Sequence, residues 1–182
     1  MISQAEAWRM LESADEIRGA DEVAAAVKRL AREVTDKLGE QHPLVLSVMG
    51  GAVVFTGHLL PLLRFPLDFD YLHVSRYGKA TQGGQLAWKV MPSESVAGRV
   101  VLVLDDILDE GHTMAAIREK ILALGATAFH CAVFAEKETG RPKPIRADFV
   151  GVSVPDRFVF GFGMDAHGAW RNLPAVYAMK SE

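Results

Sequence analysis

The spacing of apolar residues along the chain predicts an alternation of helices and strands. Between Val23 and Leu38, apolar residues return about every 3.6 positions, which indicates an amphipathic helix that ends at Gly39. Continuous apolar runs are typical of strands buried on both faces of a sheet, and they cover 44–49, 99–104, 128–134 and 148–152. The other expected elements are a capped helix over 3–11, helices over 53–63 and 112–124, and two antiparallel strands over 67–74 and 85–90. This order predicts an α/β fold with a central parallel sheet flanked by helices.

One segment, 100–113, combines a buried strand with a group of acids and the start of a helix. Its apolar residues lead into Asp105 and Asp106, and a short loop then reaches Gly111 and a helical pattern. Where a parallel strand ends and a helix begins, the free N–H groups of the first helical turn attract phosphate, and open α/β sheets bind ligands at that edge. Adjacent carboxylates add acceptors for two neighbouring sugar hydroxyls, or ligands for Mg²⁺. The segment therefore predicts a site for a ribose phosphate.

Two other interpretations of these acids are a solvated acidic loop before an ordinary helix, and a receiver domain in which adjacent acids hold Mg²⁺ beside a phospho-acceptor. Neither requires the continuation Gly-His-Thr at 111–113. The whole segment resembles the phosphoribosyl-diphosphate (PRPP) signature of the type I phosphoribosyltransferases. That signature has four apolar residues, two acids and two more apolar residues, and then Asp, a variable residue, Gly, a variable residue and Thr; the segment matches every defining position.

Composition and charge fit one globular domain and exclude several classes of protein. The 182 residues are 49% hydrophobic and 24% charged, which is ordinary for a domain with a sizeable core. The net charge of −3 argues against a general nucleic-acid binder. We expect no membrane partner, because the sequence has neither a signal peptide nor a long apolar span. The single cysteine, Cys131, cannot form an intrachain disulfide, so we expect a cytoplasmic protein.

Three further segments follow expected strands and carry weaker signals. The Met-Gly-Gly segment at 49–51 could bring backbone N–H groups close to an anion, although an ordinary tight turn fits equally well. Arg76 and Tyr77 begin a glycine-containing loop whose closure could bring the arginine to a pyrophosphate, although a lone loop arginine is more often solvated. Lys137 could donate a hydrogen bond to a carbonyl group, although most lysines are exposed.

The C-terminal third narrows the resemblance to the hypoxanthine-guanine phosphoribosyltransferases. Lys137 begins an ordered series of segments that resemble the purine-binding end of that family; they are DFVG at 148–151, VPDRFVFGFGMD at 154–165 and WRNL at 170–173. With the earlier segments, the resemblance covers about residues 42–180. It implies the type I phosphoribosyltransferase fold as one domain over 1–182, with a core at about 40–152 and a small hood built from the chain ends at about 1–20 and 153–182.

The resemblance also implies a role for each matching residue. It places the ribose phosphate on the PRPP signature, at Asp105, Asp106, Ile107, Leu108, Asp109, Glu110, Gly111, His112 and Thr113. Pyrophosphate would lie against Met49, Gly50, Gly51, Arg76, Tyr77 and Arg171, and the purine against Lys137, Phe158, Val159 and Asp165. The expected cofactor, Mg²⁺, would be held by Asp105, Asp106 and Asp165, and Asp109 would be the catalytic residue that accepts the purine N7 proton. Taken alone, Phe158 is typical of a core aromatic residue and Asp165 of a turn.

Two positions differ from the family pattern. The family commonly has a lysine where this chain has Met49, in a pair with glycine that tends to adopt a cis peptide bond. A thioether carries no charge, so we expect pyrophosphate binding there to depend on backbone N–H groups. The usual lysine before the signature threonine is His112, which adds positive charge near neutral pH only when it is protonated. We expect neither change to remove activity, because phosphate loops bind mainly through backbone donors.

The activity that the resemblance implies is purine salvage. A pentosyltransferase of this family moves the 5-phosphoribosyl group from PRPP to N9 of hypoxanthine or guanine, giving IMP or GMP and pyrophosphate, and it forms a homodimer or homotetramer. The alternatives are a xanthine-preferring or hypoxanthine-only transferase and, in a different class, a nucleotide- or RNA-binding regulator on the same fold. The sequence leaves the preference among the 6-oxopurines open, because it depends on the backbone near Val159 and on Asp165.

Overall fold

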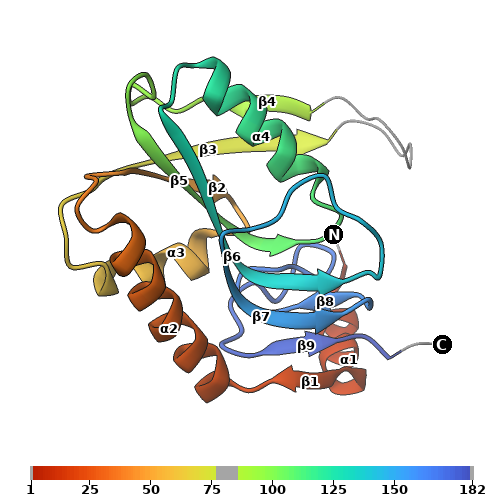
Figure 1. Cartoon of the computed structure of the whole chain (residues 1–182). Helices are drawn as coiled ribbons and strands as arrows, with labels where there is room; N and C mark the ends of the chain where they lie inside the picture. The colour runs from red at the N-terminus through yellow and green to blue at the C-terminus, as the bar shows by residue number, and fades with distance from the viewer. Residues whose placement is uncertain (1, 77–85, 181–182) are drawn as a thin grey trace.

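The computed structural model describes residues 2–76 and 86–180, which form a central sheet with helices on both faces and a second, small sheet (Figure 1). The helices are α1 (Gln4–Ser13), α2 (Ala20–Leu38), α3 (Val53–Leu59), the short 3₁₀ helix η1 (Leu60–Leu62) and α4 (His112–Ala123). The strands are β1 (Asp15–Arg18), β2 (Leu44–Met49), β3 (Asp68–Arg76), β4 (Leu86–Val90), β5 (Val100–Leu108), β6 (Ala128–Glu138), β7 (Phe149–Pro155), β8 (Val159–Phe160) and β9 (Val176–Ala178). The predicted site residue Tyr77 lies outside the described residues.

The central sheet is parallel except at one edge. In the described part of the chain its strand order is β4-β3-β2-β5-β6-β7. Strands β3, β2, β5, β6 and β7 pair in parallel, and β4 pairs antiparallel with β3. The predicted parallel sheet and its antiparallel edge pair are therefore both confirmed. The carboxyl ends of β2, β5 and β6 consequently lie at one edge, where an open α/β sheet binds its ligand.

At the centre of this sheet both faces are buried, and the side chains of one strand alternate between the two faces. In β5, Val101 and Val103 pack in the layer that contains α4, whereas Leu102 and Leu104 pack in the layer that contains α2 and α3. All four side chains are fully buried. A strand buried on both sides needs apolar residues at every position, and for this reason the core strands stand out as continuous runs in the sequence.

The helix predicted over 53–63 ends earlier than expected. The α-helix stops at Leu59 and the chain continues as the single 3₁₀ turn η1, whose second residue is Pro61. Proline has no N–H group to donate to the carbonyl four residues before it, so the α-helical hydrogen-bond pattern cannot continue through this position.

Strand β5 extends beyond its predicted end at Leu104. Its register with β6 continues up to the pair Leu108 and Glu136. Asp105 and Asp106 are therefore strand residues, whereas the sequence had suggested that they lie in a loop. Polar residues continue the strand here because their backbone groups still pair with β6, while their side chains reach the edge of the sheet.

The small sheet joins segments that are far apart in the sequence. Its antiparallel strands have the order β1-β9-β8 (Figure 1). Arg157 fastens it, since its Nη2 donates to Asp15 Oδ2 at 2.6 Å and to the Met179 carbonyl at 2.7 Å. A hood built from the chain ends was part of the predicted fold, and we refer to α1, the small sheet and the loop 161–175 as the hood. Its short strands, none longer than four residues, were not predicted individually.

Among the described residues, no helix is long and apolar enough to cross a membrane.

Candidate active site

A cleft of about 600 Å³ lies where the carboxyl ends of β2, β5 and β6 face the hood. Its walls contain most of the residues that the sequence singled out. The lining residues are Val48, Met49, Gly50, Gly51, His73, Val74, Asp105, Asp106, Ile107, Leu108, Asp109, Glu110, Gly111, Thr113, Met114, Lys137, Arg141, Asp156, Asp165 and Arg171. Segments that are separated by more than a hundred residues therefore meet in one place.

Three predicted site residues whose side chains the structure describes do not line this cleft. His112 is exposed at the first position of α4, and Val159 is buried in β8. Phe158 is 48% exposed, and its ring stacks on that of His167 with centroids 6.0 Å apart. Arg76 is the last residue of β3, and its side chain lies outside the described part of the structure.

Two adjacent carboxylates form the acidic wall of the cleft. Asp105 Oδ1 accepts a hydrogen bond from the Asp106 N–H at 3.0 Å, and Asp106 Oδ1 accepts one from the Ile107 N–H at 2.8 Å. Burial raises the pKa of Asp105 well above its ordinary value, and the neighbouring Asp106 carboxylate raises it further. Burial also raises the pKa of Asp106, where the positive charge of Arg171 acts in the opposite direction. Two carboxylates in such surroundings favour a cation or hydroxyl donors beside them.

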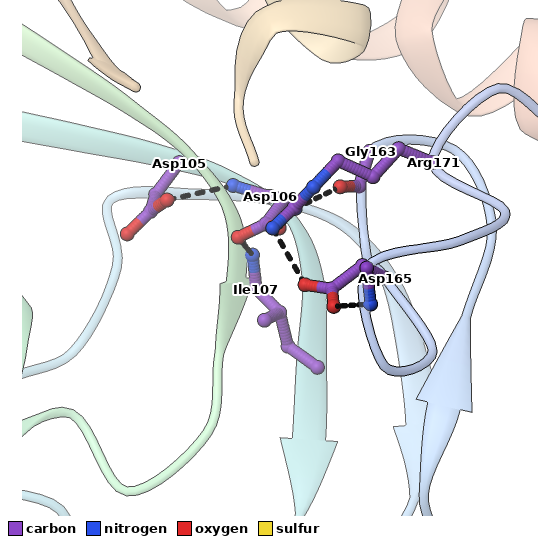
Figure 2. A network of polar contacts seen from close by, with 7 residues as sticks. Asp105, Asp106, Ile107, Gly163, Asp165 and Arg171 are labelled. Atoms are coloured by element: carbon purple, nitrogen blue, oxygen red, sulfur yellow. Dashed lines mark hydrogen bonds and ion pairs between the residues drawn. The ribbon is translucent and has the colours of Figure 1, made fainter. Parts of the chain in front are cut away.

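Arg171 connects this acidic wall to the hood (Figure 2). Its Nη2 donates to Asp165 Oδ1 at 2.5 Å, and its Nη1 donates to the Gly163 carbonyl and lies 3.7 Å from Asp106 Oδ2. Asp165 in turn accepts a hydrogen bond from the Gly168 N–H at 2.7 Å. Figure 2 shows Asp105 directed away from this group, so the two adjacent acids face different parts of the site.

The carboxylates suit a magnesium ion that shares its coordination with a substrate. In the part of the chain that the structure describes, no three His, Cys, Asp or Glu side chains are arranged to hold a metal ion by themselves. Mg²⁺ commonly keeps several waters and binds through one or two carboxylates together with substrate phosphates. The buried carboxylates of Asp105 and Asp106 fit that pattern, because burial raises the pKa of both and a nearby divalent cation would favour their charged forms.

Lys137 and Asp109 form an ion pair across the cleft, from β6 and from the loop after β5. Lys137 Nζ donates to Asp109 Oδ2 at 2.7 Å. The lysine side chain is 13% exposed, whereas the aspartate side chain is 48% exposed. The pair therefore presents a donor and an acceptor next to each other, and its carboxylate faces solvent.

Close backbone contacts explain two of the glycines. A Cβ atom on Gly51 would collide with the carboxylate of Asp106, and one on Gly163 would collide with the Gly51 carbonyl. Gly50, by contrast, has no other atom within 4 Å of its missing Cβ, and the Met49–Gly50 peptide bond is cis. The 49–51 loop thus lies close to the Asp106 side chain of the acidic wall and to the backbone of the hood at Gly163.

The loop 109–111, where the sequence predicts a phosphate site and which we call the phosphate loop, ends in a left-handed residue. Gly111 precedes α4 with a φ of 82°, a conformation that residues with side chains rarely adopt. The first turn of α4 begins immediately afterwards, and both Gly111 and Thr113 line the cleft. The N-terminus of a helix therefore lies at the cleft, and the free N–H groups of such a terminus bind phosphate in other proteins.

Four titratable or charged residues near the cleft were not predicted as site residues from the sequence. His73, Arg141 and Asp156 line it, and Lys143 lies behind Lys137, where its ammonium group is bonded to three oxygens. His73 lies within β3, whereas Arg141 follows β6 and Asp156 follows β7. Residues after a strand often carry function, but single charged residues there are usually solvated. No pattern in the sequence marks Lys143 as a buried lysine.

Comparison with known proteins identifies the family of this chain. Residues 13–167 match the family described as the phosphoribosyl transferase domain. Hypoxanthine-guanine phosphoribosyltransferase from Bacillus subtilis (strain 168) is 34% identical over 161 residues, which cover 88% of this chain and 89% of that protein. The protein of the same name from Streptococcus thermophilus (strain CNRZ 1066) is 31% identical over 163 residues, covering 89% and 91%. A solved structure of a hypoxanthine-guanine-xanthine phosphoribosyltransferase has a TM-score of 0.84 at 27% identity, covering 93% of this chain and 99% of that one. The chain therefore belongs to the phosphoribosyltransferase family, among the hypoxanthine-guanine phosphoribosyltransferases.

Proposed function

We propose that this protein transfers the 5-phosphoribosyl group of PRPP to N9 of hypoxanthine or guanine, which yields IMP or GMP and pyrophosphate. The observation that carries the proposal is the meeting of a phosphate loop, two adjacent carboxylates and the Lys137–Asp109 pair in one cleft. The phosphate loop and the two carboxylates suit a ribose phosphate, and the Lys137–Asp109 pair suits a 6-oxopurine.

The Lys137–Asp109 pair matches one edge of a 6-oxopurine. Atoms O6 and N7 are neighbours on that edge, and in the tautomer that reacts at N9 they are an acceptor beside an N–H donor. A lysine ammonium has three donors and no acceptor, so it can keep Asp109 as a partner while it donates to O6. Adenine presents an amino group at position 6, and Lys137 has no acceptor to offer it. Polar groups left unpaired in this way can discriminate by about 10⁴–10⁵-fold.

The chemical step exchanges one bond at the anomeric carbon for another. The bond from C1 of the ribose to the pyrophosphate oxygen breaks and its electron pair leaves with pyrophosphate, while the lone pair of purine N9 forms the new C1–N9 bond. Asp109 accepts the N7 proton, which removes the positive charge that would otherwise build on the base. Asp105 and Asp106 accept hydrogen bonds from the ribose hydroxyls, and the Gly111–Thr113 turn binds the 5′-phosphate.

Two further groups act on the pyrophosphate end. Arg171 and the backbone of Gly50 and Gly51 would contact the leaving group, with Arg76 and Tyr77 contributing from their loop. Mg²⁺, held by Asp105, Asp106 and Asp165 together with substrate oxygens, would supply charge neutralisation for pyrophosphate. On the purine side, Phe158 would stack on the base and the Val159 backbone would contact its pyrimidine edge.

The protein would work in the cytoplasm as a homodimer or homotetramer. Phe69 and Tyr71 support self-association, because they lie on one face of β3 and each is 43% exposed. Large aromatic side chains side by side on a surface are typical of protein interfaces.

One steady-state comparison tests the activity. Hypoxanthine, guanine, xanthine and adenine are each supplied with PRPP and Mg²⁺, and nucleotide formation is followed. We expect IMP and GMP to form rapidly and AMP very slowly. Adenine turnover equal to that of hypoxanthine would refute the role of Lys137, and turnover of xanthine alone would favour the xanthine-preferring alternative. Nucleotide binding without any turnover would instead point to a regulator.

A further inference from the structure

We propose that Lys143 is a positioning residue for the transfer, which holds Asp109 and Lys137 at the spacing that a 6-oxopurine requires. This inference rests on the proposed function and extends it to a residue outside the cleft wall. Lys143 lies in the loop between β6 and β7. It contacts neither of the two side chains, but it bonds to the backbone of the strands that carry them.

The ammonium group of Lys143 uses all three of its N–H donors in hydrogen bonds. Its Nζ donates to the Lys137 carbonyl at 2.7 Å, to the Leu108 carbonyl at 3.0 Å and to Glu136 Oε1 at 3.2 Å. The side chain is only 11% exposed. An ammonium group has three N–H donors, and here three oxygens accept them. A buried lysine with all its donors used in this way is uncommon, because most lysines remain in solvent.

The three acceptors join two strand ends at the point where their pairing stops. The register between β5 and β6 ends at Leu108 and Glu136. Leu108 directly precedes Asp109, and Lys137 directly follows Glu136. Beyond the last pair β5 and β6 no longer pair with each other: β6 continues along β7 up to Glu138, whereas the chain leaves β5 after Leu108. Lys143 bridges the two ends, and we infer that it contributes to the separation of Asp109 from Lys137.

The backbone around Lys143 is itself constrained. Pro142 and Pro144 flank the lysine, and a residue between two prolines is confined to extended conformations. The same loop packs on the phosphate loop: a Cβ atom on Gly111 would lie 3.4 Å from Lys143 Cβ and 3.4 Å from Pro144 Cδ. Lys143 thus reaches the strand ends from a stiff support that also contacts the phosphate loop.

This geometry predicts an effect on both rate and base selection. Lys137 Nζ and Asp109 Oδ2 are 2.7 Å apart, a spacing that suits neighbouring atoms on one edge of a purine. Misplacement of a catalytic group by about 1 Å can cost ~10²-fold in rate. Loss of the bridge would let the two strand ends separate, whereas the ribose-phosphate contacts of Asp105 and Asp106 would remain within the paired part of β5.

The test compares three variants of the full-length protein. Lys143→Met keeps the length of the side chain and removes its charge and its N–H donors, whereas Lys143→Arg keeps the charge and the donors. Lys120→Met makes the change from lysine to methionine on the exposed face of α4. For each, we would measure kcat, the KM values for hypoxanthine and PRPP, the rate with adenine, and the melting temperature. We expect kcat/KM for hypoxanthine to fall by ~10–100-fold in Lys143→Met. The KM for PRPP should change by no more than a few-fold, and the preference for hypoxanthine over adenine should narrow.

The controls separate positioning from stability. Lys143→Arg should recover most of the activity, and Lys120→Met should match the wild type. Unchanged kcat/KM and base preference in Lys143→Met would overturn the inference, as would an equal loss toward both purines that tracks the melting temperature. If Lys143→Met does not fold, Lys143→Gln, which retains two N–H donors, takes its place under the same criteria. An inactive wild type would overturn the proposed function and this inference together, whereas an active wild type with an unaffected variant overturns this inference alone.

Discussion

Replacing Asp109 with asparagine tests the chemical step most directly. Asparagine keeps the shape of the side chain, and its amide oxygen can still accept the hydrogen bond that Lys137 donates at 2.7 Å. It cannot take a proton or carry a negative charge. We therefore expect Asp109→Asn to preserve the geometry of the site and to lose proton transfer from N7.

Loss of the Lys137–Asp109 ion pair and loss of proton transfer differ enough in their effect on kcat to be distinguished. The Asp109 side chain is 48% exposed, so solvent screens its ion pair with Lys137. Pairs of this kind contribute at most about 1 kcal/mol, which corresponds to less than about tenfold in an equilibrium. Loss of a general base typically lowers kcat by ~10²–10⁴, or about 3–5 kcal/mol in the barrier. A fall in kcat beyond ~10²-fold, with the KM for PRPP within a few-fold of the wild type, would thus report the proton transfer and not the ion pair.

The assay must isolate chemistry from product release, since release limits kcat in many enzymes. Single-turnover formation of IMP, measured by rapid quench with enzyme in excess, provides this. Glu119→Gln, the same change of acid to amide on the exposed face of α4, is the matched control and should leave the rate unaltered. A near-normal single-turnover rate in Asp109→Asn would mean that solvent or another group accepts the proton, and the mechanism proposed above would be wrong.

Three further predictions concern the surroundings of the site. Met49→Ala should keep the apparent affinity for PRPP within a few-fold and Met49→Lys should strengthen product inhibition by pyrophosphate by less than about tenfold, because backbone groups make the contact; a hundredfold loss of PRPP affinity in Met49→Ala would contradict this. Gly51→Ala should lower kcat/KM by at least ~10²-fold because its Cβ would displace the Asp106 carboxylate, and Gly50→Ala, where the space is open, should lose less; equal losses would argue against the steric reason. Burial alone would raise the pKa of Asp70, but hydrogen bonds from Glu94, Tyr71 and Ser93 outweigh it and lower the pKa below its ordinary value of 3.8. The hydrogen bonds to the Asp70 carboxylate therefore stabilise the fold fully above the ordinary pKa, and this contribution is lost as the pH falls through the lower, folded-state pKa. Urea unfolding should show Asp70→Asn to be less stable than the wild type by about 1–3 kcal/mol at pH 7, with a smaller difference at pH 3.

Local sequence patterns were sufficient for the central sheet and for the strand–loop–helix unit formed by β5 and α4. The core strands are buried on both faces and therefore read as unbroken apolar runs, as in Val101 to Leu104. The PRPP signature lies within one strand–loop–helix unit, so its residues are brought together by local structure alone. Lys137, Asp165 and Arg171 lie far from that unit in the sequence, and only the resemblance to a family assigned them to the site.

Features that depend on packing between distant segments could not be predicted. The Lys137–Asp109 pair follows from the register of β5 with β6, and Arg171 reaches Asp106 only because the hood folds over the edge of the sheet. The burial of Lys143 is a property of the loop around it and has no counterpart in hydrophobic periodicity. The hood strands are too short to show an alternation of apolar and polar residues, and so the sequence does not predict them as strands.

The pairing of β1 with β9 has a consequence for biosynthesis. These strands lie side by side in the small sheet although about 160 residues separate them, from Asp15 to Ala178. A ribosome therefore releases the whole central sheet before β1 meets its partner, and contacts of such high sequence separation form late in folding. Arg171 and Asp165 precede β9 by five and eleven residues, so Arg171 reaches Asp106 at that same late moment and Asp165 pairs with Arg171 there. A nascent chain can thus form β5, α4 and the loop between them early, while the side of the cleft that Arg171 and Asp165 line is still open. The complete cleft arises only as synthesis of the hood is completed.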